Sequence, residues 1–178
     1  MRRFLRVLRC GLFLSLFFST ISMADQVIIL RHALAPGVGD PEGFDLEECQ
    51  TQRVLSSEGR QQAIEIGQKL RESGITEAEV FSSEWCRCLE TAELLGFGPP
   101  QKLTALNSFF HASNRHLKQQ FLQDWKAHIS EVKTAKTKVY ITHQVNISGL
   151  LDKFLSSGEG VVVEVNEQGK LKIVSILQ

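Results

Sequence analysis

Three short apolar segments alternate along the chain with segments of helical periodicity, and this alternation most constrains the fold. Residues 27–30 and 138–142 have the length and composition of buried strands, and residues 79–83 form a short strand that ends in small polar residues. Between them, apolar residues recur every three or four positions, as on the buried face of a helix. Strands that alternate with helices are typical of a layered α/β fold with a mainly parallel sheet.

The remaining elements are predicted from periodicity and from turn residues. One helix follows a cap at Ser56 or Ser57 and stops at Gly74. A weak strand is expected near residues 102–106. Further helices are predicted at residues 84–95, 113–133 and 145–155, and a terminal hairpin at residues 160–165 and 170–176.

Residues 1–24 have the pattern of a secretory signal peptide. Four arginines lie within the first nine positions, an apolar stretch covers residues 11–21, and Ser22-Met23-Ala24 forms a cleavage site of small residues. We expect cleavage after Ala24 and a periplasmic or secreted protein with no stable membrane anchor. An uncleaved anchor is the alternative. Residues 25–178 have a length that suits one domain with a single core.

The charge balance argues against nucleic acid as a partner. The chain carries 20 Lys and Arg against 20 Asp and Glu, and the predicted cleavage would remove four arginines and no acid. The remaining chain is mildly acidic and has no run of basic residues, whereas nucleic-acid binding needs a basic patch.

Three cysteines follow the predicted cleavage site, namely Cys49, Cys86 and Cys88. Disulfides persist in exported proteins, so we expect one bridge from Cys49 to either Cys86 or Cys88. Metal binding is the alternative, and it is less favoured because no Cys-x-x-Cys pair is present.

Charged and titratable residues follow the predicted strands. Arg31 and His32 follow the first strand, His143 follows the third, and Arg87 lies near the start of a helix after the second. The carboxyl ends of parallel strands meet at one edge of a sheet, so these side chains are expected to converge. Two guanidinium groups and two imidazoles suit a phosphoryl group, which a histidine can accept covalently.

Each of these residues also has a purely structural interpretation. His143 can be a core histidine that bonds a carbonyl, and Arg87 can pair with Glu84 or Glu90 on its own helix.

The loop over residues 33–54 contains several glycines and prolines and shows no helical or strand periodicity. Because it leaves directly from Arg31-His32, we interpret it as a wall or lid of the site.

Four segments resemble the motifs of a known family, in that family's order. They are Ile29-Leu30-Arg31-His32-Ala33, residues 55–63 (Leu-Ser-Ser-Glu-Gly-Arg-Gln-Gln-Ala), residues 82–92 (Ser-Ser-Glu-Trp-Cys-Arg-Cys-Leu-Glu-Thr-Ala) and residues 139–144 (Val-Tyr-Ile-Thr-His-Gln). The chain resembles the histidine phosphatase superfamily, in its phosphoglycerate-mutase-like branch. Alanine stands at position 33, where the family's Arg-His-Gly signature has glycine.

This resemblance implies a three-layer α/β/α sandwich and a metal-independent phosphatase without cofactor. By position, His32 is the nucleophile that becomes phosphohistidine. Arg31, Arg87 and His143 bind the phosphoryl group, joined by the backbone N–H of Gln144. The implied partner is a small phosphorylated substrate, a phosphomonoester.

The chain departs from the family pattern at the proton donor. Many relatives carry a glutamate in a Leu-x-Glu segment, and the matching stretch here is Leu106-Asn107-Ser108. Either the leaving group needs no proton, or another acid serves. Asp40 is the first candidate, followed by Asp45 and Glu48, although all three can be solvated loop acids.

The missing acid leaves two further functions open. One is a phosphohistidine or phosphoramidate hydrolase, because nitrogen leaving groups depend differently on an acid. The other is a non-catalytic module that recognises phosphate.

Overall fold

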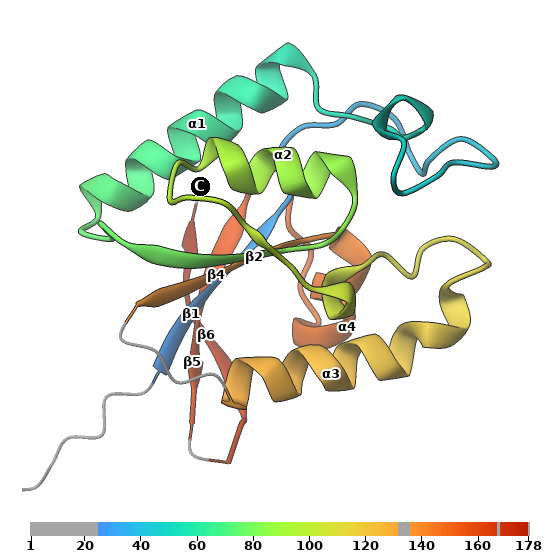
Figure 1. Ribbon diagram of the computed structural model, residues 1–178. Coiled ribbons are helices and arrows are strands. Elements are labelled where there is room, and N and C mark those ends of the chain that lie inside the picture. The colour runs from blue at the N-terminus through green and yellow to red at the C-terminus, as the bar shows by residue number, and fades with distance from the viewer. Residues whose placement is uncertain (1–24, 132–135, 167, 178) are drawn as a thin grey trace, which may run out of the picture.

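The computed structural model describes residues 25–131, 136–166 and 168–177, so the predicted signal peptide lies outside the described residues. Six strands form one sheet in the order β3-β2-β4-β1-β5-β6 (Figure 1). Strands β3, β2, β4 and β1 pair in parallel, whereas β5 and β6 add an antiparallel hairpin beside β1. The mainly parallel sheet is therefore confirmed. The strands are β1 (Asp25–Arg31), β2 (Ala78–Ser82), β3 (Gln101–Lys102), β4 (Thr137–Thr142), β5 (Gly160–Val165) and β6 (Leu171–Leu177).

Helices cover both faces of this sheet, which gives the expected three layers. Helices α1 and α2 lie on one face, and α3 and α4 lie on the other (Figure 1). Within the described ranges, no helix has the length and apolar character needed to cross a membrane. The helices are α1 (Ser57–Glu72), α2 (Cys86–Leu94), α3 (Lys118–Glu131) and α4 (Gln144–Leu151), with short 3-10 helices at Cys49–Thr51, Thr104–Leu106 and Arg115–Leu117.

Alternating side chains of the central strand separate two cores. Val27 and Ile29 of β1 pack on the α3 and α4 side, together with the fully buried Trp125. Ile28 and Leu30 pack on the α1 and α2 side. A strand that is apolar at successive positions must be covered on both faces, and here it is.

The start of α1 holds the chain that leaves β1. The Ser56 hydroxyl accepts the N–H of Gly59, which is the cap that the sequence predicts. Gly59 lies so close to the loop that a Cβ would stand 2.1 Å from the carbonyl oxygen of Leu34. Because Leu34 is two residues after His32, this contact fixes the path of the site loop.

Predicted and observed ends differ most in three elements. Helix α3 begins at Lys118 rather than residue 113, because a separate 3-10 turn precedes it. Helix α4 ends at Leu151 rather than 155, since Asp152 adopts the left-handed conformation with φ 51°. The weak strand near residues 102–106 is two residues of strand and then a 3-10 turn.

Candidate active site

The predicted site residues line one pocket at the carboxyl ends of the parallel strands. His32 follows β1, His143 follows β4, and Arg87 lies in the first turn of α2. The rings of His32 and His143 are 5.5 Å apart between centroids. The pocket has a volume of about 210 Å³. Its lining includes all six of the residues expected from the sequence, namely Arg31, His32, Asp40, Arg87, His143 and Gln144.

His32 is oriented for attack through one ring nitrogen. Its Nδ1 lies 2.8 Å from the carbonyl oxygen of Ala33, so Nδ1 carries the proton and donates, and the lone pair is left on Nε2. The side chain is buried, and burial first, followed by the charge of Arg87, lowers its pKa to about 3. The imidazole is therefore neutral near pH 7, the form that can act as a nucleophile.

His143 is held by both of its ring nitrogens. Arg87 Nη2 donates to Nδ1 at 3.3 Å, which leaves the proton on Nε2, 2.9 Å from the Ser83 hydroxyl oxygen. Ser83 in turn donates to Oδ1 of Asn107 at 3.2 Å. Burial first, and then the charge of Arg87, lowers the pKa of His143 well below its usual value. His143 is thus a neutral hydrogen-bonding partner of Arg87.

Arg87 forms a buried ion pair with Asp40. Nη1 donates to Oδ1 at 2.7 Å and Nη2 donates to Oδ2 at 3.2 Å. The Asp40 carboxylate also accepts the indole N–H of Trp85 at 3.1 Å and the backbone N–H of Arg53 at 3.0 Å. Burial raises the pKa of Asp40, but the charge and hydrogen bonds of Arg87 outweigh it and the net pKa is lowered.

This ion pair differs from the roles that the sequence predicts for Arg87 and Asp40. Arg87 does not pair with Glu84 or Glu90, since its partner comes from the loop 47 residues earlier in the chain. Asp40 is an ionised acceptor with four donors, so it has no proton to give near pH 7.

Two further guanidinium groups line the pocket. Arg31 donates from Nη1 to the carbonyl oxygen of Leu155 at 2.9 Å. Arg53 donates from Nε to the carbonyl oxygen of Gly39 at 2.9 Å and from Nη1 to that of Ala35. Sequence reasoning missed Arg53. Its position in the sequence could have identified it, because Arg53 is a cation between the site loop and the helix cap at Ser56.

Arg31 and Arg87 each keep one N–H donor without a hydrogen-bond partner in the part of the chain that the structure describes. Among the described residues, Nε of Arg31 and Nε of Arg87 are buried without an acceptor. Buried N–H groups without a partner are rare, because each one loses its bond to water. Both guanidinium groups therefore retain capacity for a further anion.

Gln144 is placed at the first turn of α4. Its side chain is committed to the segment that follows the helix, since Nε2 donates to Lys153 O at 3.0 Å and Oε1 accepts the N–H of Leu155 at 2.9 Å. The first N–H groups of a helix have no partner within it and favour an anion. The backbone of Gln144, rather than its amide, is thus the part suited to a phosphoryl oxygen.

The loop over residues 33–54 forms one wall of the pocket, as expected. Residues 37–40 line the pocket, whereas Asp45 and Glu48 are exposed and do not.

A disulfide joins Cys49 to Cys86 with 5.6 Å between the Cα atoms, so the predicted bridge is confirmed and the partner of Cys49 is Cys86. Cys88 is a buried free thiol whose pKa burial raises to about 12.

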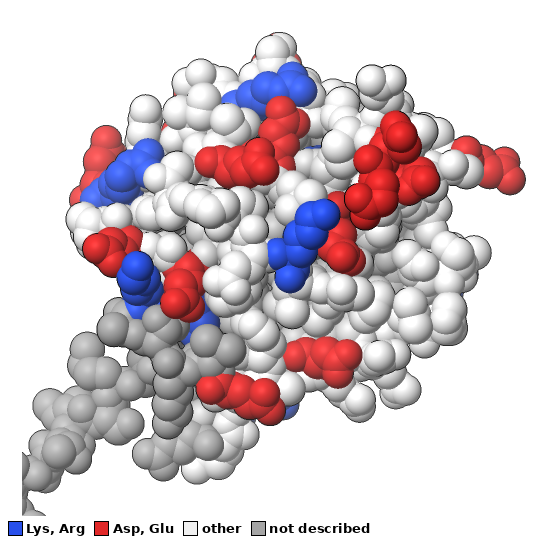
Figure 2. Space-filling view, viewed as in Figure 1, with Lys and Arg blue, Asp and Glu red and all other residues white. Residues whose placement is uncertain are grey.

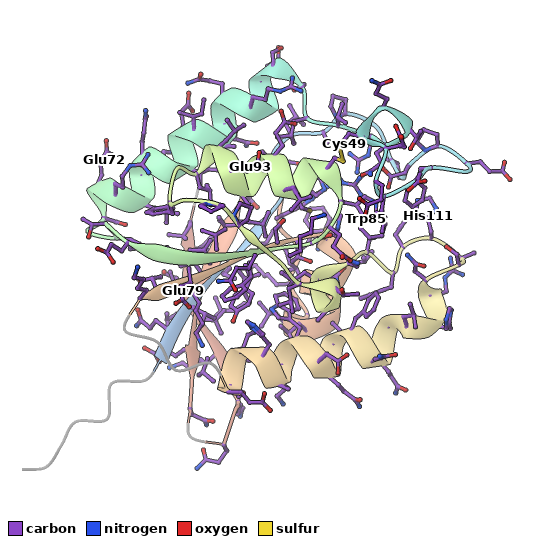
Figure 3. All side chains as sticks on the ribbon, viewed as in Figure 1. Cys49, Glu72, Glu79, Trp85, Glu93 and His111 are labelled. Atoms are coloured by element: carbon purple, nitrogen blue, oxygen red, sulfur yellow. A yellow bond between two sulfur atoms is a disulfide. The ribbon has the colours of Figure 1, made fainter. Side chains whose placement is uncertain are left out.

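The opposite wall comes from the segment where the family's acid was expected. Ser108 lines the pocket, and its hydroxyl accepts the N–H of Phe110 at 3.3 Å, so this position supplies no carboxylate. Phe110 and His111 line the pocket as well, and sequence reasoning missed both. His111 and Trp85 lie on the same side of the molecule as Cys49 (Figure 3).

Comparison with known proteins gives one family match. Residues 27–111 match the family model described as the histidine phosphatase superfamily (branch 1). This segment contains Arg31, His32, Asp40, Arg53 and Arg87 of the pocket. The comparison with curated protein sequences gives no significant match.

Solved structures share the fold at low sequence identity. The protein histidine phosphatase SixA, solved with tungstate, is 16% identical, has a TM-score of 0.65, and the match covers 85% of this chain and 96% of that one. An open reading frame product of Mycobacterium tuberculosis is 16% identical over the same shares, with a TM-score of 0.64. A mycobacterial glucosyl-3-phosphoglycerate phosphatase is 14% identical, with 85% and 97% covered and a TM-score of 0.59.

Proposed function

We propose that this chain is a member of the histidine phosphatase superfamily that hydrolyses a phosphomonoester through a phosphohistidine intermediate on His32. The observation that carries the proposal is the orientation of His32. Its Nδ1–H is committed to Ala33, and its Nε2 lone pair is left in a pocket that three guanidinium groups line. The family match over residues 27–111 and the shared fold support it.

Arg31, Arg53 and Arg87 would bind the oxygens of the phosphoryl group. A guanidinium fork matches two phosphate oxygens, and several cations together offset the charge of a dianion. The backbone N–H of Gln144 would add one donor at the start of α4. A bound dianion next to His143 would favour the charged imidazole, which turns Nδ1 into a donor toward a phosphoryl oxygen.

In the first step, Nε2 of His32 attacks phosphorus and the bond to the leaving oxygen breaks. The N–P bond forms as the leaving oxygen takes up a proton. Charge on the three equatorial oxygens is stabilised by the fixed guanidinium groups, which need not reorganise at the moment of reaction. The Nδ1–H bond to Ala33 stabilises the positive charge that develops on the ring.

In the second step, a water molecule attacks phosphorus from the side that the leaving group vacated. The water gives up a proton, the N–P bond breaks, and inorganic phosphate leaves with His32 neutral again. In this scheme the chain itself supplies the nucleophile and all the positive charge that binds the phosphoryl group. We therefore propose that the reaction needs no metal ion and no other cofactor.

The test is hydrolysis of p-nitrophenyl phosphate by the purified protein in the presence of EDTA. We expect steady release of p-nitrophenol that EDTA does not reduce and that orthophosphate inhibits competitively. No release from a protein that still binds orthophosphate would favour the non-catalytic phosphate-recognising module. A requirement for added divalent metal would contradict the scheme.

A phosphohistidine or phosphoramidate hydrolase is the second candidate. Two observations favour it, namely the absence of a carboxylate at Ser108 and the shared fold with the protein histidine phosphatase SixA. A nitrogen leaving group can be protonated before attack, so it depends less on an acid in the site. A kcat/KM for phosphoimidazole far above that for alkyl phosphates would identify this activity.

We also propose that the protein is exported and that its mature N-terminus is Asp25. The basic, apolar and small-residue succession of residues 1–24 supports this, and so does the Cys49–Cys86 disulfide, since such bridges persist in oxidising compartments. Intact-mass analysis of periplasmic or secreted protein should show loss of residues 1–24. A full-length mass in the membrane fraction would contradict it.

A small phosphorylated molecule, and not nucleic acid, is the partner we propose. On the face shown in Figure 2, acidic and basic side chains are interspersed, without a continuous basic surface. Binding to a nucleic-acid backbone depends on such a surface. A gel-shift assay with single- and double-stranded DNA should show no complex at physiological salt.

A further inference from the structure

The proposed hydrolysis needs a proton for the leaving oxygen, and the pocket offers few groups that can carry one. The three guanidinium groups of the lining stay protonated, so among the described residues the histidines and the carboxylate are left, namely His32, Asp40, His111 and His143. His32 is the nucleophile, and His143 is bound on both nitrogens by Arg87 and Ser83. The choice therefore lies between Asp40 and His111.

Asp40 is poorly suited to donate a proton. Its carboxylate accepts four hydrogen bonds, two of them from the guanidinium group of Arg87. A carboxylate offers about four lone-pair positions, so the ionised form is fully satisfied. Protonation would break the contact with Arg87 and leave a buried cation without its partner.

His111 has the position and the freedom that Asp40 lacks. It lines the same pocket from the opposite wall, and its side chain is 25% exposed. Its Nε2 accepts the backbone N–H of Asp40 at 3.2 Å, so the proton of the neutral ring is on Nδ1, and Nδ1 has no protein acceptor among the described residues. The ring packs against Phe44 at 5.0 Å and against Phe110 at 5.9 Å between centroids, which restricts its direction.

We propose that His111 is the general acid of this active site and protonates the leaving oxygen in place of the family's glutamate. The assignment rests on the proposed function. As the P–O bond breaks, the imidazolium gives its Nδ1 proton to the departing oxygen and becomes neutral. In the second step, the same nitrogen takes the proton from the attacking water while the N–P bond breaks, so that each turnover restores the starting state.

The surroundings of His111 fit a ring that gains and loses a proton. When Nε2 becomes protonated, it can no longer accept the N–H of Asp40. Oδ2 of Asp40 lies 3.6 Å from Nε2 and can then accept its proton. Arg87 and the backbone N–H of Arg53 are bound to the same carboxylate, and the aromatic rings packed on His111 are the uncharged Phe44 and Phe110.

The test compares leaving groups of different basicity in the His111→Gln variant. Glutamine can still accept the N–H of Asp40 but cannot carry a proton. For ethyl phosphate, whose leaving oxygen is strongly basic, we expect kcat/KM to fall about 10²-fold or more, and for p-nitrophenyl phosphate less than about 5-fold. His116→Gln is the matched control, because His116 is exposed on the same segment and outside the pocket, and it should change neither value.

Two further measurements separate this role from a structural one. In His111→Ala, added imidazole should restore turnover of ethyl phosphate and leave that of p-nitrophenyl phosphate nearly unchanged. In the wild type, kcat/KM for ethyl phosphate should fall at alkaline pH through a limb that His111→Gln lacks.

The possible outcomes separate a failure of the His111 assignment from a failure of the proposed phosphatase function. If the wild type hydrolyses p-nitrophenyl phosphate and His111→Gln loses the same factor on both substrates, without rescue by imidazole, His111 is not the acid. If the wild type hydrolyses neither substrate, the proposed function fails, and the assignment with it.

Discussion

Asp40 accepts a hydrogen bond from each terminal nitrogen of Arg87, at 2.7 Å from Nη1 and 3.2 Å from Nη2. The two side chains are 1% and 3% exposed. A buried carboxylate and guanidinium hold each other in place, since either one alone would be a desolvated charge. Asp40 therefore sets the direction in which Arg87 faces the pocket.

Replacing Asp40 tests this positioning role. Asp40→Asn keeps the shape of the side chain but removes the charge, so we expect a loss of about 3 kcal/mol in the free energy of unfolding. With Arg87 misdirected, kcat/KM for p-nitrophenyl phosphate should fall about tenfold or more, since a lost charge-assisted contact costs about 1.5–3 kcal/mol. Urea denaturation and steady-state kinetics measure both effects.

Asp45→Asn is the control, because Asp45 is exposed in the same loop and does not line the pocket. The outcome that contradicts a positioning role is an Asp40→Asn variant with normal p-nitrophenyl phosphate turnover and slow ethyl phosphate turnover. That pattern would return Asp40 to the role of proton donor.

The buried histidines predict a stability that falls in mild acid. The pKa of His32 is lowered to about 3 and that of His143 well below normal, chiefly by burial, whereas histidine in an unfolded chain titrates near about 6.5. Between these values the unfolded chain binds more protons, so the free energy of unfolding should fall as pH drops from about 7 toward 4. Each histidine contributes up to about 1.4 kcal/mol per pH unit.

Urea denaturation at a series of pH values from about 7.5 to 5 measures this slope, above the range in which Asp40 begins to contribute to it. His143→Gln should reduce the slope of the free energy of unfolding against pH by up to about 1.4 kcal/mol per pH unit, the contribution of one proton. A slope that is the same in the wild type and the variant would show that His143 is not buried in the neutral form.

The disulfide predicts one free thiol and a stabilised loop. Cys49 and Cys86 are 37 residues apart, and closing a loop of that length stabilises the fold by about 3–4 kcal/mol on the chain-entropy estimate. Cys49→Ser should lose about that amount of unfolding free energy in urea denaturation under oxidising conditions.

Exported protein with residues 1–24 removed should show one thiol when denatured without reductant, and almost none when native, because Cys88 is buried and its pKa is about 12. Three thiols after denaturation would refute the bridge.

Two glycines of α1 predict separable effects on stability and activity. At Gly59 a Cβ would stand 2.1 Å from the carbonyl oxygen of Leu34, and at Gly67 it would stand 2.2 Å from that of Leu95. Gly59→Ala and Gly67→Ala should each cost about 1–3 kcal/mol in the free energy of unfolding through overpacking.

Only Gly59→Ala displaces the chain that leaves His32, so we expect kcat/KM to fall much further in that variant than in Gly67→Ala. Thermal denaturation and p-nitrophenyl phosphate kinetics on both proteins test this. Equal activity of the two variants would show that the contact with Leu34 does not position the site.

Much of the fold follows from the sequence because its signals are local. The alternation of apolar strands with amphipathic helices predicts the layers, and His32 and His143 at strand ends predict the edge where they meet. The boundaries that were wrong, such as the start of α3 at Lys118, are set by loop contacts that have no period. Asp152 ends α4 through a left-handed conformation, although Asp at this position gives only a weak signal.

The site was harder to predict where it depends on the loop over residues 33–54. The sequence identifies Asp40 as a candidate, but its partner Arg87 becomes apparent only when the loop folds over α2. Arg53 and His111 belong to no motif and reach the pocket through loop packing. The choice of Cys86 over Cys88 is likewise geometric, since Cys88 faces the core beside His143 at 3.5 Å.

The most direct measurement of the central claim is a search for phosphate bound covalently to His32. Protein mixed rapidly with a labelled phosphomonoester and quenched in alkali should yield a labelled peptide that contains His32. The label should be stable to base and labile to acid, as an N–P bond is. His32→Ala, with a circular dichroism spectrum like that of the wild type, should carry no label and hydrolyse no substrate. Label on another residue, or full activity of His32→Ala, would contradict the account.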